Sequence, residues 1–169
     1  MKKSLILLVI LCAGAGLHAQ MGLFNLAYGH TVAQADSILA SHSFYPEGSE
    51  HHAIKYYSDV NLLIDAIMVF VEPESQRIAG WFVKYSALNG EDNDHIVIDR
   101  IMDMHGKTNH FDEDTQQLIW FLSTTRTLHV MYSSEGNLTA LYYDSVFPEL
   151  FKMNEDAQKA PEDIPEPIE

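Results

Sequence analysis

The chain has few basic residues, a single cysteine and no hydrophobic run long enough to cross a membrane. Only 10 Lys and Arg stand against 24 Asp and Glu, which gives a formal charge of −14 over 169 residues. Such an acidic chain repels phosphate backbones, so we do not expect nucleic acid as a partner. Hydrophobic residues make up 47% and aromatic residues 11%. This is enough to close one core, so the sequence predicts one globular domain.

The first 19 residues have the features of a secretory signal peptide. Two lysines at positions 2 and 3 precede the apolar run from Leu5 to Leu11, and small residues follow up to Ala19. A membrane-spanning helix needs about 20 apolar residues, and no second run of this kind follows, so we expect no transmembrane segment. The sequence therefore predicts cleavage after Ala19 and a periplasmic or secreted protein.

The only cysteine, Cys12, lies inside this signal peptide. Its removal would leave an exported protein without disulfides, without a thiol nucleophile and without a cysteine-ligated zinc site. Cleavage would also remove the lysines at positions 2 and 3, which takes the formal charge from −14 to −16. Leu11 stands where a lipoprotein signal needs a small residue, so we expect no lipid anchor. Export without disulfides favours a bacterial envelope protein.

Two segments have the spacing of amphipathic helices. In the first, Thr31 and Gln34 match a capping box, so we expect a helix from position 32 to about Ser41. Its buried stripe would consist of Val32, Ala35, Ile38 and Leu39. In the second, Val97, Ile101 and Met104 recur at helical spacing after a polar segment at 89–94, and Gly106 is a plausible C-terminal cap.

Six runs rich in β-branched and aromatic residues predict strands. They are Ala53–Ser58, Ile64–Val71, Ile78–Ser86, Gln117–Ser123, Thr125–Ser133 and Asn137–Asp144. Ser43–His52 and Lys107–Thr115 lack periodicity, so we expect loops there. We predict an α+β fold with an antiparallel sheet of about six strands and two helices on one face, in two helix-then-three-strand units. The domain would span residues 20–150, followed by an acidic, proline-rich, disordered tail at 151–169.

The stretch Tyr28-Gly29-His30-Thr31 leads directly into the first predicted helix, which carries Ala35 and Ile38-Leu39. With the antiparallel strands that follow, it resembles small helix-plus-sheet modules of bacterial envelopes: the BamE-type outer-membrane assembly lipoproteins and the tandem-repeat β-lactamase inhibitory proteins. Both families are binders rather than enzymes, and one sheet face serves partner recognition in them. The resemblance therefore implies a non-catalytic binding module. The chain lacks a lipobox and a Gly-Pro turn after the first helix, so no functional residue is transferred.

Several predicted strands are apolar on both alternating faces. In the run Ile78–Ser86, Trp81 and Val83 would lie on one face and Phe82 on the other. Helices on one side leave the second face to loops, to a second copy or to a partner. Tryptophan, tyrosine and methionine are typical of protein interfaces. The sequence therefore predicts a partner-binding sheet face formed by Trp81, Trp120, His129, Met131 and Tyr143.

A metal site is the chemical alternative. His105, His110, Asp112 and Asp114 lie around the end of the second predicted helix, and imidazole together with carboxylate suits zinc. Helix capping and solvation of the loop explain the same residues without a metal. No serine stands in a Gly-x-Ser-x-Gly elbow, and we expect no cofactor. Three functions remain open: a module that binds a protein or an envelope component, a metal-dependent hydrolase, and a structural homo-oligomer.

Overall fold

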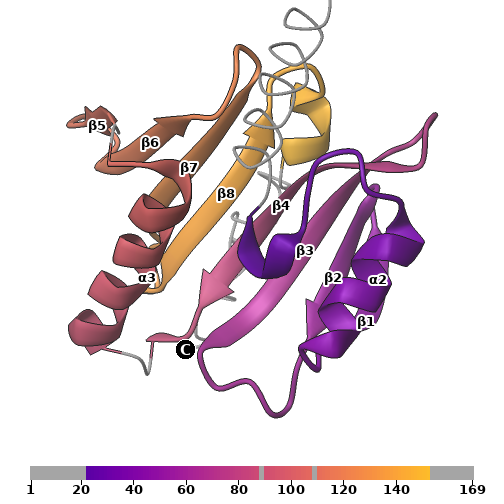
Figure 1. The fold of residues 1–169 in the computed structure, drawn as a ribbon, viewed down its shortest axis with the longest axis horizontal. Coiled ribbons are helices and arrows are strands. Elements are labelled where there is room, and N and C mark those ends of the chain that lie inside the picture. The colour runs from indigo at the N-terminus through magenta and orange to yellow at the C-terminus, as the bar shows by residue number, and fades with distance from the viewer. Residues whose placement is uncertain (1–21, 88–89, 108–109, 153–169) are drawn as a thin grey trace, which may run out of the picture.

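The computed structural model describes residues 22–87, 90–107 and 110–152, so the predicted signal peptide and residues 153–169 of the predicted tail lie outside it. Within these residues the chain forms an α+β fold with one antiparallel sheet of eight strands (Figure 1). The helices are α2 (Val32–Ser41) and α3 (Gly90–His105), with the short 3-10 helices η1 (Leu23–Asn25) and η3 (Pro148–Phe151). None of these helices is long and apolar enough to cross a membrane.

The chain builds two similar units, each a helix followed by four strands. The first unit has α2 and strands β1 (Tyr45–Glu50), β2 (Ala53–Tyr57), β3 (Ile64–Glu72) and β4 (Arg77–Tyr85). The second has α3 and strands β5 (His110–Asp112), β6 (Gln117–Phe121), β7 (Arg126–Tyr132) and β8 (Leu138–Asp144). The sheet order is β1-β2-β3-β4-β8-β7-β6-β5, so the last strand of each unit meets its counterpart at the centre.

The α+β class and the antiparallel sheet are confirmed, but the count of about six strands is wrong because both edge strands were predicted as loops. β1 lies inside Ser43–His52, and β5 lies inside Lys107–Thr115. All six residues of β1 are exposed, so no buried face imposes the alternation by which strands are recognised. Pro46 also lies at an irregularity in the pairing of β1 with β2. Proline and a bulge are common on edge strands, where they oppose further pairing.

The predicted capping box begins α2 as expected. The Oγ1 of Thr31 accepts from the Gln34 backbone N–H at 3.2 Å, and the Thr31 N–H donates to Gln34 Oε1 at 2.8 Å. Ala35 and Leu39 are fully buried against the sheet. Asp36 of α2 accepts a 2.6 Å hydrogen bond from the Tyr56 hydroxyl. This bond ties α2 to β2.

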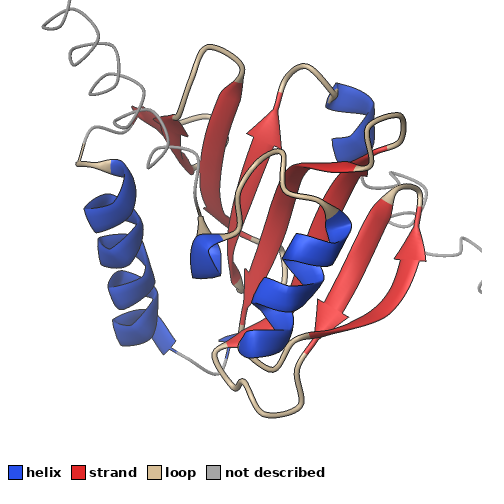
Figure 2. Cartoon of the chain, turned by 45° about the vertical axis from the view of Figure 1, so that its right-hand side comes forward, coloured by secondary structure: helices blue, strands red, loops and turns tan. Residues whose placement is uncertain are grey.

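Both α-helices cover the same face of the sheet, which we call the helix face (Figure 2). Leu39 of α2 and Ile101 of α3 belong to one core cluster with side chains from the central strands. The segment before α2 lies between the two helices in Figure 1, and its Leu26 and Tyr28 belong to the same core cluster. The opposite face, which we call the second face, holds a smaller cluster around Phe70.

The helix η3 packs on the second face over β3 and β4. Leu150 is buried there, and the Phe151 ring lies 4.7 Å from the Phe70 ring, centroid to centroid. Gly80 of β4 allows this contact, because a Cβ at Gly80 would meet the Phe151 ring at 2.7 Å as well as the backbone oxygen of Tyr142. The close approach of η3 to the sheet therefore depends on a residue without a side chain.

Gly80→Ala should lower the free energy of unfolding by about 1–3 kcal/mol, because the added methyl group would clash with the Tyr142 backbone oxygen of β8 and with the Phe151 ring. The matched control is Gly48→Ala in β1, where a Cβ would have no atom within 4 Å. Urea denaturation followed by circular dichroism measures both. Equal stability of the two variants would contradict the close contacts of Gly80 with Tyr142 and Phe151.

Candidate binding face

The register of the strands places one residue from each strand in a single row across the second face. Met68 pairs with Phe82, Phe82 with Leu141, Leu141 with His129, and His129 with Ile119. All five side chains are partly exposed. Lys55 of β2 continues the row beyond Met68, and His110 of β5 continues it beyond Ile119. The centre of the second face is therefore an apolar band with a histidine in it.

The row that holds the two tryptophans runs across the helix face instead. Trp81 pairs with Tyr142, Tyr142 with Leu128, and Leu128 with Trp120. Trp81 is 0% exposed and Trp120 is 1% exposed, and the Trp120 indole N–H donates to the Gly106 carbonyl at 3.1 Å. Both tryptophans are thus core residues beneath the helices. Their prediction as partner-binding residues is corrected.

His129, Met131 and Tyr143, the other three predicted residues, lie together on the second face. Met131 pairs with Thr139, and Tyr143 pairs with Thr127. The Tyr143 ring meets the His129 ring edge-on, with centroids 6.2 Å apart. The structure therefore divides the predicted set: two residues belong to the core, and three lie side by side on a partly exposed surface.

The imidazole of His129 is held in place by two neighbours. Its Nε2 lies 2.8 Å from the Thr127 hydroxyl, and its Nδ1 lies 3.0 Å from Gln117 Oε1. Burial lowers the pKa of His129 below its usual value, because the charged ring is poorly solvated. His129 is therefore a neutral, fixed ring at pH 7, suited to packing and hydrogen bonding within a binding surface.

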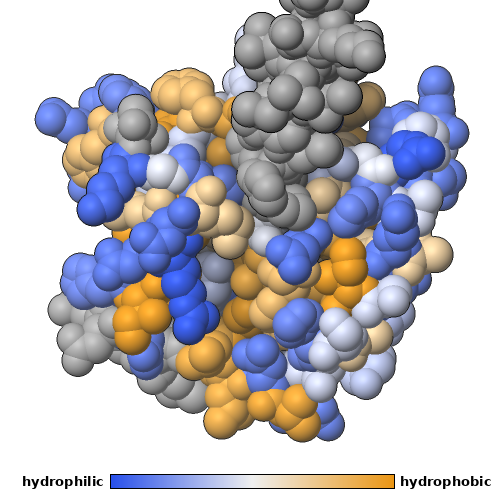
Figure 3. Space-filling view, in the orientation of Figure 1, coloured by the Kyte–Doolittle hydropathy of each residue, from blue (hydrophilic) through white to orange (hydrophobic). Residues whose placement is uncertain are grey.

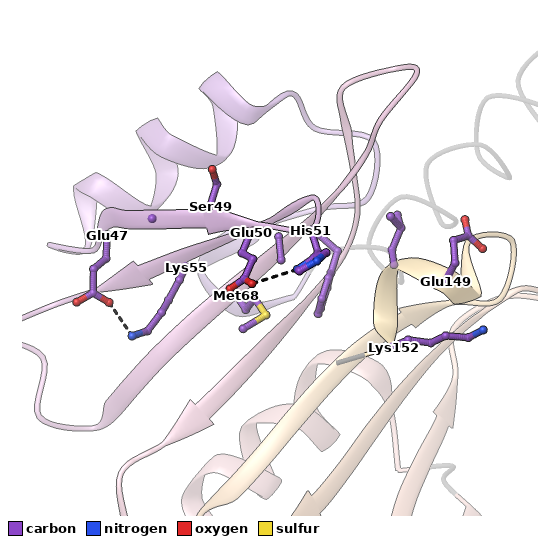
Figure 4. A pocket seen from close by; sticks show the side chains of 12 residues that line it. Glu47, Ser49, Glu50, His51, Lys55, Met68, Glu149 and Lys152 are labelled. Atoms are coloured by element: carbon purple, nitrogen blue, oxygen red, sulfur yellow. Dashed lines mark ion pairs between the residues drawn. The ribbon is translucent and has the colours of Figure 1, made fainter. Parts of the chain in front are cut away.

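A hollow opens at one end of the second face, between the β1–β2 hairpin and η3 (Figure 4). Its volume is about 570 Å³. Ala53, Met68, Phe70 and Leu150 form its apolar part. The charged residues around it are Glu47, Glu50, His51, Lys55, Glu149 and Lys152. Met68 belongs both to this hollow and to the central row, so the two features are continuous.

Two exposed pairs of side chains lie on the hairpin side of the hollow. Lys55 Nζ lies 2.6 Å from a carboxylate oxygen of Glu47, and His51 Nδ1 lies 3.3 Å from a carboxylate oxygen of Glu50. Sequence reasoning missed this site because it treated Ser43–His52 as a loop. The sequence does indicate one part of the site: Met68 and Phe70 are two residues apart on one strand, so both lie on the face opposite the buried residues of that strand.

The four residues of the predicted metal site do not converge. The His105 Nε2 lies 3.0 Å from the Tyr142 hydroxyl on the helix face, and burial lowers the pKa of His105. Asp112 Oδ1 accepts from the backbone N–H groups of Asp114 and Thr115 at 3.0 and 3.2 Å. The Thr115 backbone bond is the main reason that the pKa of Asp112 is lowered. Across residues 22–87, 90–107 and 110–152, no three His, Cys, Asp or Glu side chains gather as metal ligands.

The loop between β2 and β3 exposes a separate apolar group. Val60, Leu62 and Leu63 are 65%, 80% and 54% exposed, and Figure 3 shows hydrophobic side chains at the lower edge of the molecule, where this loop lies. The Ser58 hydroxyl accepts from the Asn61 N–H at 3.1 Å, and Asn61 Oδ1 accepts from the Leu63 N–H at 3.0 Å. The loop lies outside the central row and its hollow, so it provides control positions for them.

No protein-family model, no curated protein and no solved structure matches this chain. The resemblance to small bacterial envelope modules therefore stays a prediction.

Proposed function

We propose that this chain is an exported, non-catalytic binding module that recognises a protein through its second face. The observation that carries the proposal is the row from Met68 to Ile119, five facing residues across five strands on the side away from both α-helices. A sheet that is apolar on both faces needs a cover on each. The helices α2 and α3 cover the helix face. On the second face η3 covers one part, and a partner would cover the remainder.

The composition of the row supports a protein partner. Methionine and aromatic residues are enriched at protein interfaces, and methionine adapts its shape to a partner. The surface lies on the central strands β4 and β8 of a continuous sheet, and η3 packs against it. A preorganised surface loses little conformational entropy on binding. The arrangement thus fits recognition better than chemistry, for which the predicted His and Asp residues do not come together.

Charge substitutions on the second face should abolish capture of the partner. The protein, carrying a tag and produced in its native organism, is crosslinked in an envelope extract, and captured proteins are identified by mass spectrometry. Ile119→Glu places a charge in the apolar band, and Met131→Glu places one beside it, two residues along β7 from His129. Each should reduce specific capture by about tenfold or more, because a buried unpaired charge is costly. Circular dichroism confirms that the variants fold.

The control is Val60→Glu on the β2–β3 loop, which should capture the partner as the unchanged protein does. Capture that survives both charge substitutions on the second face would remove this face as the binding site. Crosslinks only between copies of the chain, lost in the Met131→Glu variant, would assign the second face to a homo-oligomer instead.

A further inference from the structure

The hollow beside η3 has the size and lining of a pocket for an anchoring side chain. Ligand pockets in proteins commonly enclose about 300–1,000 Å³, and this one measures about 570 Å³. Phe70 and Leu150 are nearly fully buried beneath it, at 2% and 7% exposed, whereas Met68 is partly exposed. The hollow therefore offers an apolar floor already assembled in the free chain, with a flexible thioether to adapt to what enters.

Carboxylates stand on both sides of this apolar floor. Glu50 belongs to the β1–β2 hairpin on one side, and Glu149 belongs to η3 on the other. Lys55 is paired with Glu47 at 2.6 Å, and Glu50 lies 3.3 Å from His51. The Glu149 and Lys152 side chains both extend away from the hairpin in Figure 4. The lining therefore holds three carboxylates against two lysines and one histidine. The net charge of the whole chain is −14, so the long-range field also attracts cations.

We propose that the hollow binds a basic peptide segment, seating one bulky apolar side chain on the floor while flanking Lys or Arg residues face Glu50 and Glu149. This inference rests on the proposed binding function and specifies the partner as a basic segment with an apolar anchor. Apolar burial would provide most of the affinity, and the carboxylates would select the charge of the partner.

Charge complementarity favours a basic peptide over two other occupants of the hollow, namely the chain's own C-terminal segment and a second copy of the chain. The segment after Lys152 has six acidic residues and one lysine in its sequence, so the two rim carboxylates repel it. A second copy of the chain is acidic as well, and like charges at an interface disfavour association. A basic partner is the occupant that the charge of the hollow and of the chain both favour.

The binding test uses three dye-labelled synthetic peptides with identical Gly-Ser flanks and a central Lys-Phe-Lys, Glu-Phe-Glu or Lys-Gly-Lys. Fluorescence anisotropy with the full chain should show saturable binding of the Lys-Phe-Lys peptide. Binding should be about tenfold weaker or more for the Lys-Gly-Lys peptide, which lacks the apolar anchor, and for the Glu-Phe-Glu peptide, which has the wrong charge. Raising the salt from 50 to 500 mM should weaken binding of the Lys-Phe-Lys peptide.

Two kinds of variant connect binding to the hollow. Gly48→Trp should abolish binding, because Gly48 lines the hollow and open space surrounds its Cβ position, so the indole would fill the site without changing the charge. Gly48→Ala is its control and should bind normally. Glu50→Lys and Glu149→Lys should each weaken binding of the Lys-Phe-Lys peptide and strengthen that of the Glu-Phe-Glu peptide.

Equal binding of the three peptides, unchanged binding by the Gly48→Trp variant, or no binding below 1 mM peptide would each overturn the inference. The proposed function is judged separately by partner capture. Capture that Met131→Glu abolishes and Gly48→Trp leaves intact would keep the second face as a binding surface and reject the hollow as its anchor pocket. Capture lost in both variants would support the two together.

Discussion

Trp81→Ala should lower the free energy of unfolding by about 3–5 kcal/mol, the cost typical of truncating a large buried aromatic residue. Trp81 is 0% exposed, and its ring stacks on the Tyr142 ring with centroids 4.4 Å apart. Its indole N–H has no hydrogen-bond partner among the described residues, so the loss is one of packing and apolar burial. Chemical denaturation followed by far-ultraviolet circular dichroism measures the effect without relying on tryptophan fluorescence.

The neighbouring residue provides the matched control. Phe82 is next to Trp81 on β4 but faces the other way, is partly exposed and belongs to the central row of the second face. Phe82→Ala should therefore cost less stability than Trp81→Ala and should reduce partner capture in protein that remains folded. If Trp81→Ala instead left stability within about 1 kcal/mol of the unchanged protein and abolished capture, the assignment of the two faces would be reversed.

The alternation within each strand was readable from the sequence, but the relation between strands was not. His129 and Met131 share a face because they are two residues apart on β7. Their spacing in the sequence is enough to predict this. Trp120 was grouped with them, yet the register of β6 against β7 sets it opposite Leu128, on the helix face. Register depends on the turn that joins two strands. Sequence periodicity alone therefore cannot place residues of different strands on a common face.

Structure that depends on neighbouring residues could be predicted from the sequence, whereas structure that depends on residues far apart in the chain could not. The capping box at Thr31 and Gln34 involves atoms three residues apart, so its prediction was confirmed in detail. Strand β1 depends on pairing with β2, and its sequence of Pro, Gly, Ser and Glu has no hydrophobic face. The hollow could not be predicted for the same reason, because its lining combines residues of β1, β2, β3 and η3. The sequence indicates only that Met68 and Phe70 share a face of their strand.

A second large effect is expected at the ion pair between Arg126 and Asp144 on the helix face. Arg126 Nε donates to Asp144 Oδ2 at 2.9 Å, and the Asp144 side chain is only 3% exposed. The guanidinium lies 4.4 Å from the centroid of the Tyr28 ring, and the Tyr28 hydroxyl donates to the Tyr143 carbonyl at 3.2 Å. This cluster joins the segment before α2 to β7 and β8, so it links the two units beyond the pairing of β4 with β8.

Arg126→Met should lower the free energy of unfolding by about 3–5 kcal/mol, because it leaves the buried Asp144 carboxylate without its partner. Asp144→Ala should cost less, about 3 kcal/mol, because the Arg126 side chain is 26% exposed and can reach water. The double variant Arg126→Met with Asp144→Leu removes both charges and should cost less than the sum of the single variants.

The ion pair of Lys84 with Glu135 supplies the control, because these side chains are 30% and 68% exposed. Glu135→Gln breaks this ion pair in solvent and should leave the midpoint of thermal unfolding unchanged within error. Strictly additive losses at Arg126 and Asp144 would contradict an energetic coupling between them, and with it the idea that this pair helps to hold the two units together as one domain.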